Sequence, residues 1–501
     1  YSIRGIGFYD YSIGAVPAVT VYQDEAPLTF ATMTRGSAFD LERVEVLKGP
    51  QGLFFGSNST GGAVNYIAAK PTRTLKAGID ASYGNYGAYQ LGGFVSGPVS
   101  DTLAVRLALS HEGGDAWQRS TTSSRENGAR DFTQGRFLVD WTPTDRLSLA
   151  LSLDAFSDKS DAQAGQLIAV NPLLPPFVDP TLATRPLVTK DARAADWSSA
   201  RNPSRDDQMY RGALRVDYDL TDAVKLTSLT SVAHYEQDDF VDPDATTLEM
   251  VDTRDEGSIN AFSQELRLSG DVKNSKLRWL VGANYELNRV RETQTLRAVD
   301  ASGFRSFNIV FGVPTPDDVR NFTNQRFENK AAFGNIDYDV TDQITLHGGL
   351  RYTDSSINFS GCTSDTANGS LGTVLNIILG ASYAFTDCTT LNAALVPALS
   401  KEKLDEDNVS WRVGADYKLN DDVLFYGNAS RGFKSGSFPL LPATSTEQYT
   451  PVTQEDVLAY ELGFKAKFPD QAIQLNGAVF YYDYTDKQVL GSVVLAPNIF
   501  G

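Results

Sequence analysis

The sequence predicts an all-β fold, a transmembrane antiparallel β-barrel, on two observations. Apolar and polar residues alternate along many segments: every second residue from 147 to 153 is leucine, and the residues between are serine or alanine. A strand with this pattern has one face for lipid and one for water. Short and long connections also alternate along the chain, as they do in membrane β-barrels.

The alternation gives about fifteen strands, each near the ~10 residues that a tilted strand needs to cross a bilayer. Clear examples are residues 102–110, 146–156, 344–352, 411–417 and 462–468. The sequence has no apolar run of the roughly 18 residues that an ordinary transmembrane helix needs. The apolar residues that face lipid are therefore expected at every second position of membrane-spanning strands.

The connections argue against a soluble β-sandwich, which has little reason to place every long loop at one end. Short turns are predicted at 142–145, 219–222, 339–342, 419–422 and 468–471. Long polar loops are predicted at roughly 114–132, 157–208, 237–258, 292–325, 356–408 and 434–453. In a membrane barrel the short turns are periplasmic and the long loops external.

The charge of the chain excludes one class of partner. The 501 residues carry a formal net charge of -18, and lysine and arginine are not clustered. A nucleic-acid-binding surface needs such clusters, so no nucleic-acid partner is expected. Residue Tyr1 does not begin a signal peptide, and we expect the chain to be a fragment of a longer protein.

Residues 39–67 have a different pattern from the rest of the chain. Residues 41–47 predict a short strand, which the pair Gly49-Pro50 ends. Glycines at positions 52, 56, 61 and 62 suit a turn or a close backbone approach, and residues 63–67 predict a second strand.

This block resembles the plug domain of TonB-dependent outer-membrane receptors. The resemblance rests on Leu-Glu-Arg-Val-Glu-Val-Leu-Lys-Gly-Pro at 41–50, followed by the glycine-rich turn and by Ala-Val-Asn at 63–65. Ile-Arg-Gly-Ile-Gly at 3–7 and the segment 16–25 also fit the plug. Two barrel segments, 430–436 and 460–465, resemble segments frequent in the branch with many iron-chelate transporters.

The resemblance implies a small mixed α/β plug domain, residues 1–72, inside the lumen of a barrel formed by residues 73–501. The complete barrel of plugged transporters has about 22 strands. About seven strands are therefore expected to follow Gly501, because an open sheet edge in lipid leaves backbone groups unpaired. The start of the plug, with the energy-coupling segment of the family, is expected to precede Tyr1.

The implied function is TonB-dependent active transport of a scarce large solute, most often a ferric siderophore, across the Gram-negative outer membrane. The implied partners are the inner-membrane TonB complex, outer-membrane lipid and lipopolysaccharide, and the ferric chelate. No enzyme activity and no cofactor are expected. The alternatives are uptake of cobalamin or an oligosaccharide, a passive porin, and a soluble β-rich secreted enzyme.

A polar contact between plug and barrel is also implied by the resemblance. Family members place two basic plug residues against two barrel glutamates, and on this chain these correspond to Arg4, Lys48 and Glu461, with the second glutamate expected beyond Gly501. Parity supports the assignment, because Leu462 should face lipid and Glu461 therefore the lumen. The alternative is a set of separate, solvated charges. We expect a water-filled interface, whose polar contacts can be exchanged for water at small net cost.

Substrate contacts are expected from plug loops that point outward. The candidates are Tyr9, Tyr11, Thr29, Phe30, Thr32 and Met33. Aromatic rings suit bulky chelates. Packing within the plug core explains the same residues equally well.

Cys362 and Cys388 both fall in the predicted loop 356–408. In an oxidising compartment two cysteines in one external loop predict a disulfide, with free thiols or a metal pair as alternatives. No metal site is expected, because the histidines are scattered and the acidic segment 236–244 lacks the ligand spacing of a calcium loop. That segment is predicted to be a solvated loop.

Overall fold

A computed structural model of the chain describes most of its residues. The described residues are 1–8, 10, 12–170, 182, 184–188, 190–271, 275–300, 312, 318–365, 369–380, 382–385 and 388–489. Residues Tyr9 and Tyr11, two of the predicted substrate contacts, lie outside them.

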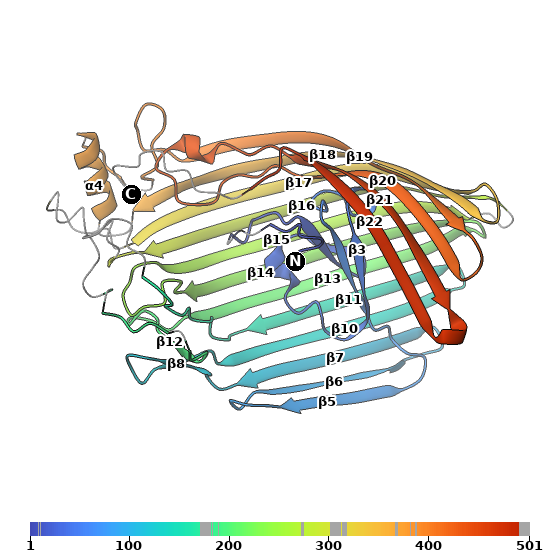
Figure 1. The fold of residues 1–501 in the computed structure, drawn as a ribbon, viewed down its shortest axis with the longest axis horizontal. Coiled ribbons are helices and arrows are strands. Elements are labelled where there is room, and N and C mark those ends of the chain that lie inside the picture. The colour runs from blue at the N-terminus through green and yellow to red at the C-terminus, as the bar shows by residue number, and fades with distance from the viewer. Residues whose placement is uncertain are drawn as a thin grey trace.

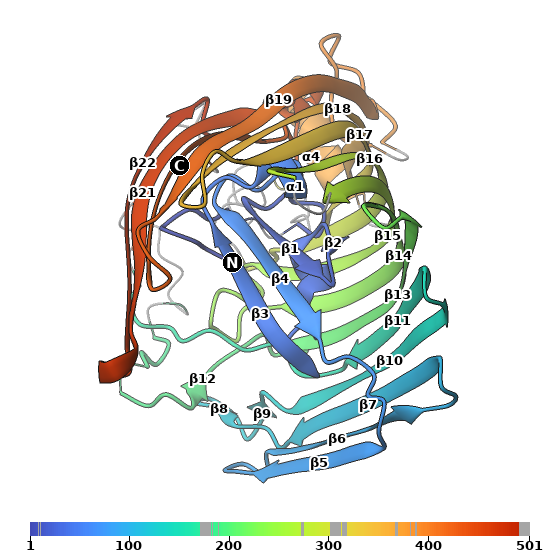
Figure 2. The ribbon, with the colours of Figure 1, turned by 90° about the vertical axis from the view of Figure 1, so that its right-hand side faces the viewer.

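The largest unit is one antiparallel sheet of 15 strands, in which each strand pairs with its neighbours in sequence order. The strands are β5 (Lys76–Tyr83), β6 (Tyr89–Pro98), β7 (Leu103–Gly114), β10 (Arg130–Thr144), β11 (Leu147–Asp158), β13 (Ser204–Thr221), β14 (Val224–Val241), β15 (Asp252–Asp271), β16 (Leu277–Arg297), β17 (Asp318–Asp339), β18 (Ile344–Asp365), β19 (Ser400–Lys418), β20 (Val423–Lys434), β21 (Glu455–Phe468) and β22 (Ile473–Thr485). The sheet curls around a lumen (Figure 2). The predicted barrel fold and number of strands are confirmed.

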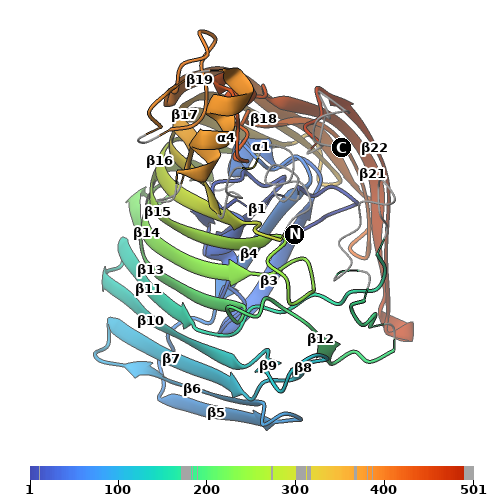
Figure 3. The same ribbon diagram turned by 90° about the vertical axis from the view of Figure 1, so that its left-hand side faces the viewer.

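The connections separate into two ends, as predicted. Short turns lie at the right of Figure 1, and the long connections gather at the left. Figure 3 shows the long-loop end, which carries several small elements. These are β8 (Gln118–Ser120), β9 (Glu126–Asn127), β12 (Ala194–Ala195), α4 (Ser370–Leu379) and the 3₁₀ helix η2 (Thr446–Tyr449). No helix in the described part of the chain is long and apolar enough to cross a membrane.

The predicted strand lengths and several loop boundaries were wrong. β17 and β18 have 22 residues each, and their ladder continues to the pair Val319 and Asp365, well inside the predicted loops 292–325 and 356–408. The prediction counted only the residues needed to cross lipid. Beyond the lipid each of these strands keeps two neighbours, so its backbone groups stay paired and the strand continues.

Side-chain parity follows the predicted pattern. In β21, Leu462 is 65% exposed on the outer face of the sheet. Its neighbour Glu461 faces the lumen and contacts the N-terminal segment of the chain. The alternation therefore separates a lipid face from a lumen face.

The N-terminal domain lies inside the curved sheet (Figure 2). Its own sheet has the order β2-β1-β4-β3. The elements are β1 (Val19–Gln23), β2 (Ala26–Leu28), the 3₁₀ helix η1 (Ala31–Thr34), β3 (Leu41–Lys48), the short helix α1 (Gly52–Phe55) and β4 (Gly62–Ala68). β1 pairs with β4 in parallel, and the other two pairs are antiparallel.

Glycine is required where β3 and β4 begin to pair. Gly62 has a φ of +142°, and a Cβ there would lie 2.3 Å from the carbonyl oxygen of Leu47. The strand β3 forms as predicted, but Val44 and Val46 on it are exposed. β3 is the edge strand of the small sheet. Within the part of the chain that the structure describes, its apolar side chains do not form a buried face.

The main apolar core joins the two domains, so polar contacts and water alone do not form the interface, although that had been expected. Plug residues such as Ile13, Leu28 and Phe30 pack in one cluster with barrel residues such as Tyr235 and Phe327. Burial of these side chains opposes plug displacement, because apolar surface would return to water. The polar contacts lie around this cluster.

Candidate functional site

The first polar contact starts from a tight turn near the N-terminus. Residues 3–6 form this turn, in which Ile3 and Ile6 exchange backbone hydrogen bonds of 3.0 Å. Arg4 has a φ of +53°, in the left-handed region, and Gly5 follows at +77°. The turn directs the Arg4 side chain to β20–β22 of the barrel wall.

Arg4 forms an ion pair of 2.7 Å with Glu461 on β21, and both side chains are more than four-fifths buried. Arg4 also donates a hydrogen bond of 2.6 Å to the hydroxyl of Tyr482, and its guanidinium lies 3.9 Å from the ring centroid of Phe480. The hydroxyl of Tyr426 donates to the other oxygen of Glu461 at 2.9 Å. Both partners are thus satisfied, as a buried charge requires. We call these five residues the Arg4 site.

The glycine of the predicted Gly-Pro pair approaches the Arg4 site. A Cβ on Gly49 would lie 3.0 Å from the Tyr482 hydroxyl oxygen. The predicted third member, Lys48, does not join the site. Its side chain is exposed and forms no ion pair within the described ranges. The role assigned to Lys48 stays a prediction.

A second polar contact lies across the lumen, at Asp40. This plug residue accepts two hydrogen bonds from Arg106 on β7, one of them 2.8 Å long. Arg136 on β10 donates to the carbonyl oxygen of Phe39 and, at 2.6 Å, to Asp154 on β11. All three charged barrel residues are buried. The planar fork of a guanidinium suits such paired hydrogen bonds to a carboxylate.

A third polar contact lies at the turn between β1 and β2. Glu25 pairs with Arg215 on β13 at 3.0 Å and with Arg267 on β15 at 2.5 Å. Each arginine also pairs with a barrel carboxylate, Asp217 or Glu265. Burial opposes ionisation of Glu25, but the two arginines outweigh it and hold its pKa below the ordinary value.

Further contacts lie toward the long-loop end. Arg35 pairs with Asp158 at 2.8 Å and with Asp207 at 3.0 Å. The backbone N–H of Ile13 donates to Glu292 on β16 at 3.1 Å. The plug is therefore held to most of the barrel wall by charged or charge-assisted contacts.

Of these contacts, only that of Arg4 is predicted from the sequence. A signal for the others was present, since Arg106 alternates with the lipid-facing residues Val105 and Leu107 and therefore faces the lumen. Asp24 and Glu25 also end the plug-like segment 16–25, where a charged tip can reach the wall. Strand alternation and position in the chain could not predict the residue with which each charge pairs.

The predicted substrate contacts that the structure describes divide into two classes. Phe30 and Met33 are fully buried in the apolar cluster between plug and barrel, and the Phe30 ring lies 5.5 Å from that of Phe327. Their burial favours the packing alternative. Thr29 and Thr32 are half-buried.

A cavity of about 250 Å³ lies between plug and barrel. Tyr22, Glu25 and Phe54 line it from the plug side, and Arg267 and Arg351 from the barrel side. Nη1 of Arg351 is buried without a hydrogen-bond partner among the described residues. The cavity marks a place where the interface is incompletely packed.

Cys362 at the end of β18 is joined to Cys388 by a disulfide, with 5.8 Å between the Cα atoms. The bond closes the connection that carries α4. The acidic segment is not the solvated loop that was predicted. Asp242 is 1% exposed, because the connection containing Ser198 packs over it and donates a backbone hydrogen bond to it.

Comparison with known families assigns both parts of the chain. Residues 1–63 match the TonB-dependent receptor plug domain, and residues 140–500 match the TonB-dependent receptor-like β-barrel. These matches cover most of the chain.

The sequence identity to individual proteins is low. The chain is 23% identical over 518 aligned residues to the pesticin receptor of Yersinia pestis, covering 98% of this chain and 63% of that protein. The ferric yersiniabactin uptake receptor FyuA of Yersinia pestis has a similar fold, with a TM-score of 0.73 at 18% identity, over 94% of this chain and 64% of that one. The siderophore receptor PiuA of Acinetobacter baumannii gives a TM-score of 0.68 at 15% identity, over 95% and 67%.

Proposed function

Because the chain belongs to the TonB-dependent receptors of the Gram-negative outer membrane, we propose that it is the plug and most of the barrel of an active transporter for a ferric siderophore. The chain spans less than two thirds of the length of the pesticin receptor. The activity, the substrate and the partners of the whole protein therefore form part of the proposal.

One observation carries the proposal: a folded domain fills the lumen and is held there by ion pairs and by an apolar cluster. A passive pore needs an open lumen. A domain held in this way leaves the lumen only when work is done on it, and an energy-coupling partner such as TonB would supply that work.

The plug contacts suit reversible displacement. Ion pairs cost desolvation when they form, so their net contribution is well below their Coulomb attraction. Arginines that also pair with barrel carboxylates, as Arg215 and Arg267 do, keep a partner when the plug residue leaves. At these two arginines the barrel wall is therefore not left with an unpaired charge during transport.

The substrate class rests on the relatives. Several structural neighbours are receptors for siderophores, among them those for yersiniabactin and alcaligin. A short match to the vitamin B12 transporter BtuB of Photobacterium profundum covers 15% of this chain and keeps cobalamin as the second candidate. The external loops and half-buried plug residues such as Thr29 and Thr32 are the proposed contacts.

Three further parts of the proposal follow from the family. The domain boundary lies near Thr72, between β4 and β5. Lys48 contributes to holding the plug in the lumen. The transporter performs no covalent chemistry, and its partners are the TonB complex, outer-membrane lipid and lipopolysaccharide.

The test measures binding and uptake separately. The full-length protein, purified in detergent, is titrated with a panel of ferric siderophores, with cyanocobalamin and a maltooligosaccharide as controls. We expect one ferric siderophore to bind saturably and the controls not to bind. Uptake of that chelate labelled with radioactive iron should stop in cells that lack TonB. Uptake that continues without TonB would identify a passive pore, and binding of cobalamin alone would overturn the iron assignment.

A further inference from the structure

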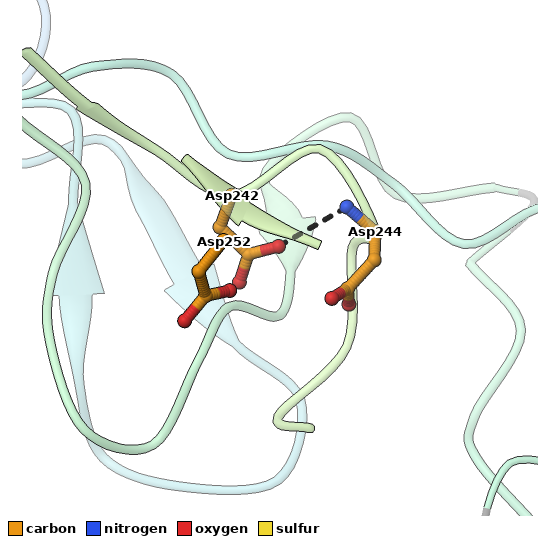
Figure 4. A group of neighbouring side chains, drawn as sticks. All are labelled: Asp242, Asp244 and Asp252. Atoms are coloured by element: carbon orange, nitrogen blue, oxygen red, sulfur yellow. Dashed lines mark hydrogen bonds between the residues drawn. The ribbon is translucent and has the colours of Figure 1, made fainter. Parts of the chain in front are cut away.

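Three aspartates meet in the connection between β14 and β15, at the long-loop end. Asp242 follows the last residue of β14, Asp252 begins β15, and Asp244 lies between them. One carboxylate oxygen from each lies within 4.8 Å of the others. Figure 4 shows the three side chains beside one another, with the backbone N–H of Asp244 donating a hydrogen bond to Asp242.

Two of the three carboxylates are buried and the third is half-buried, and the cation that faces Asp252, Arg297, forms its ion pairs elsewhere. Asp242 and Asp252 are 1% and 2% exposed, and none of the three carboxylates forms an ion pair with a residue that the structure describes. The nearest arginine along the ladder, Arg297, pairs with Glu249 and Asp318 instead. Carboxylates brought together away from water repel one another and are stable only with a proton or a cation between them.

One atom of the group points to a missing partner. Oδ1 of Asp252 is buried and accepts no hydrogen bond from the described residues. The Ser198 side chain interacts with the Asp252 carboxylate, and the other two carboxylates have donors to both of their oxygens. Asp242 accepts from the backbone N–H groups of Ser198 and Asp244, and Asp244 accepts from Thr246, Met250 and Val251. These hydrogen bonds fix the carboxylates of Asp242 and Asp244 in place, whereas Oδ1 of Asp252 has no hydrogen-bond partner among the described residues.

We propose that Asp242, Asp244 and Asp252 form a binding site for a divalent cation, and that the cation is Ca²⁺. Oxygen ligands without nitrogen or sulfur suit a hard cation. Two ligands of one Ca²⁺ at ~2.4 Å can lie up to about 4.8 Å apart, which accommodates the observed spacing. Mg²⁺ needs shorter distances and a regular octahedron, which a wide group of three carboxylates supplies less well.

The site would join two external connections. Asp242 and Asp252 close the base of the β14–β15 connection, and Ser198 belongs to the connection between β11 and β13. The hydrogen bond from Ser198 to Asp242 links the two. A bound Ca²⁺ therefore orders both connections at the external mouth of the barrel, independently of which solute the receptor transports.

Direct metal binding tests the proposal on the full-length protein in detergent. After treatment with EDTA, the protein is titrated at pH 8 with CaCl₂ by calorimetry, and separately with TbCl₃. Trp197 precedes Ser198 and is buried, so it should sensitise Tb³⁺ luminescence from this site. We expect one Ca²⁺ per chain, displacement of Tb³⁺ by Ca²⁺, and loss of the sensitised emission in Trp197→Phe.

The variant Asp252→Asn should weaken Ca²⁺ binding at least tenfold, because it removes the unsatisfied carboxylate. The matched control is Asp206→Asn, a half-exposed carboxylate on β13 outside the group, which should bind Ca²⁺ as the wild type does. In EDTA, Asp252→Asn should resist proteolysis of the two connections at least as well as the wild type, since it removes a buried charge.

Three results would overturn the proposal. The first is the absence of saturable Ca²⁺ binding up to about 10 mM, which is above the range of extracellular calcium modules. The others are equal Ca²⁺ binding by Asp252→Asn and Asp206→Asn, and binding of Mg²⁺ in preference to Ca²⁺. If Asp252→Asn does not fold, the titration of the wild type and the Tb³⁺ emission of Trp197→Phe still decide the outcome.

Discussion

Arg4 and Glu461, near the two ends of the described chain, form an ion pair of 2.7 Å between plug and barrel. The pair is mostly buried, and its two members also contact Tyr482 and Tyr426. An ion pair of this kind fixes the position of the plug more than it stabilises the fold, because desolvation offsets much of the Coulomb attraction.

Removing one partner should therefore cost more than the pair itself contributes. We expect Arg4→Ala to destabilise the N-terminal turn by about 3 kcal/mol, since Glu461 then stays buried without its counter-charge. Hydrogen exchange at the amides of Ile3 and Ile6 should accelerate accordingly. The control Arg43→Ala removes an exposed arginine on β3 that pairs only with its own strand. Equal acceleration in both variants would contradict a specific role for Arg4.

The contact at Glu25 predicts how plug retention depends on pH. The pKa of Glu25 is lowered in the folded protein, so its contribution is fully present above the ordinary value of about 4.3 and is lost as the pH falls through the lowered value. We expect hydrogen exchange of β1 and β2 to be constant from pH 8 to about pH 5 after correction for intrinsic rates, and to increase below about pH 4. In Glu25→Gln the additional low-pH increase should be smaller. An identical pH profile for both proteins would contradict the assignment.

The two classes of predicted substrate residues should respond differently to truncation. Phe30→Ala removes a buried ring from the interface cluster and should destabilise the plug by about 3–5 kcal/mol. Thr29→Ala should leave stability nearly unchanged, because Thr29 is only half-buried. Urea titration followed by hydrogen exchange measures the first effect, and ferric siderophore affinity measures any second one. A loss of affinity in Thr29→Ala without a loss of stability would support its proposed contact with substrate.

The disulfide between Cys362 and Cys388 should stabilise the connection between β18 and β19. Closing a loop of this length contributes about 3 kcal/mol by chain-entropy estimates. We expect a reducing agent to accelerate proteolysis of this connection in the wild type, and to have no effect on the double variant Cys362→Ser, Cys388→Ser. If reduction leaves the wild type equally resistant, the local packing rather than the bond orders this segment.

The proposed Ca²⁺ site should bind more tightly at higher pH. Burial, and then the charge of Asp244, raises the pKa of Asp242 to about 8, and Asp252 also faces it. Below pH 8 a proton must leave when the cation binds, so the dissociation constant should fall up to tenfold for each pH unit between about 6 and 8. Calorimetry at three pH values measures this dissociation constant. A dissociation constant that does not change over this range would show that no proton is displaced.

The stability of the same connection should change with pH in the opposite direction when the cation is removed. A carboxyl group whose pKa is raised in the folded protein loses stabilisation as the pH rises from its unfolded value to its folded one. In EDTA, proteolysis should therefore become faster between pH 5 and pH 8, and Ca²⁺ should reverse this. Glu249 and Arg297 are the other charged groups near Asp252, and they pair with each other.

Some of the fold and of the site could be read from residues alone. The alternation around Leu462 and Glu461 placed one side chain in lipid and the other in the lumen, because side chains of a strand point to opposite faces in turn. The glycine-rich segment 49–62 indicated the plug. The same alternation placed Arg106 on the lumen face. For Arg106 the missing information was the partner, whereas the resemblance had already assigned Arg4 to Glu461.

The sequence by itself determined the strands, their two faces, the family and the division into plug and barrel, because these depend on local periodicity and on short residue patterns. Only the tertiary structure decided which charges meet at Asp40 and Glu25, that Phe30 packs against Phe327, and that Asp242 lies beneath the Ser198 connection. Such contacts join residues far apart in the chain, and they depend on how the sheet curves around the plug, which no local pattern encodes.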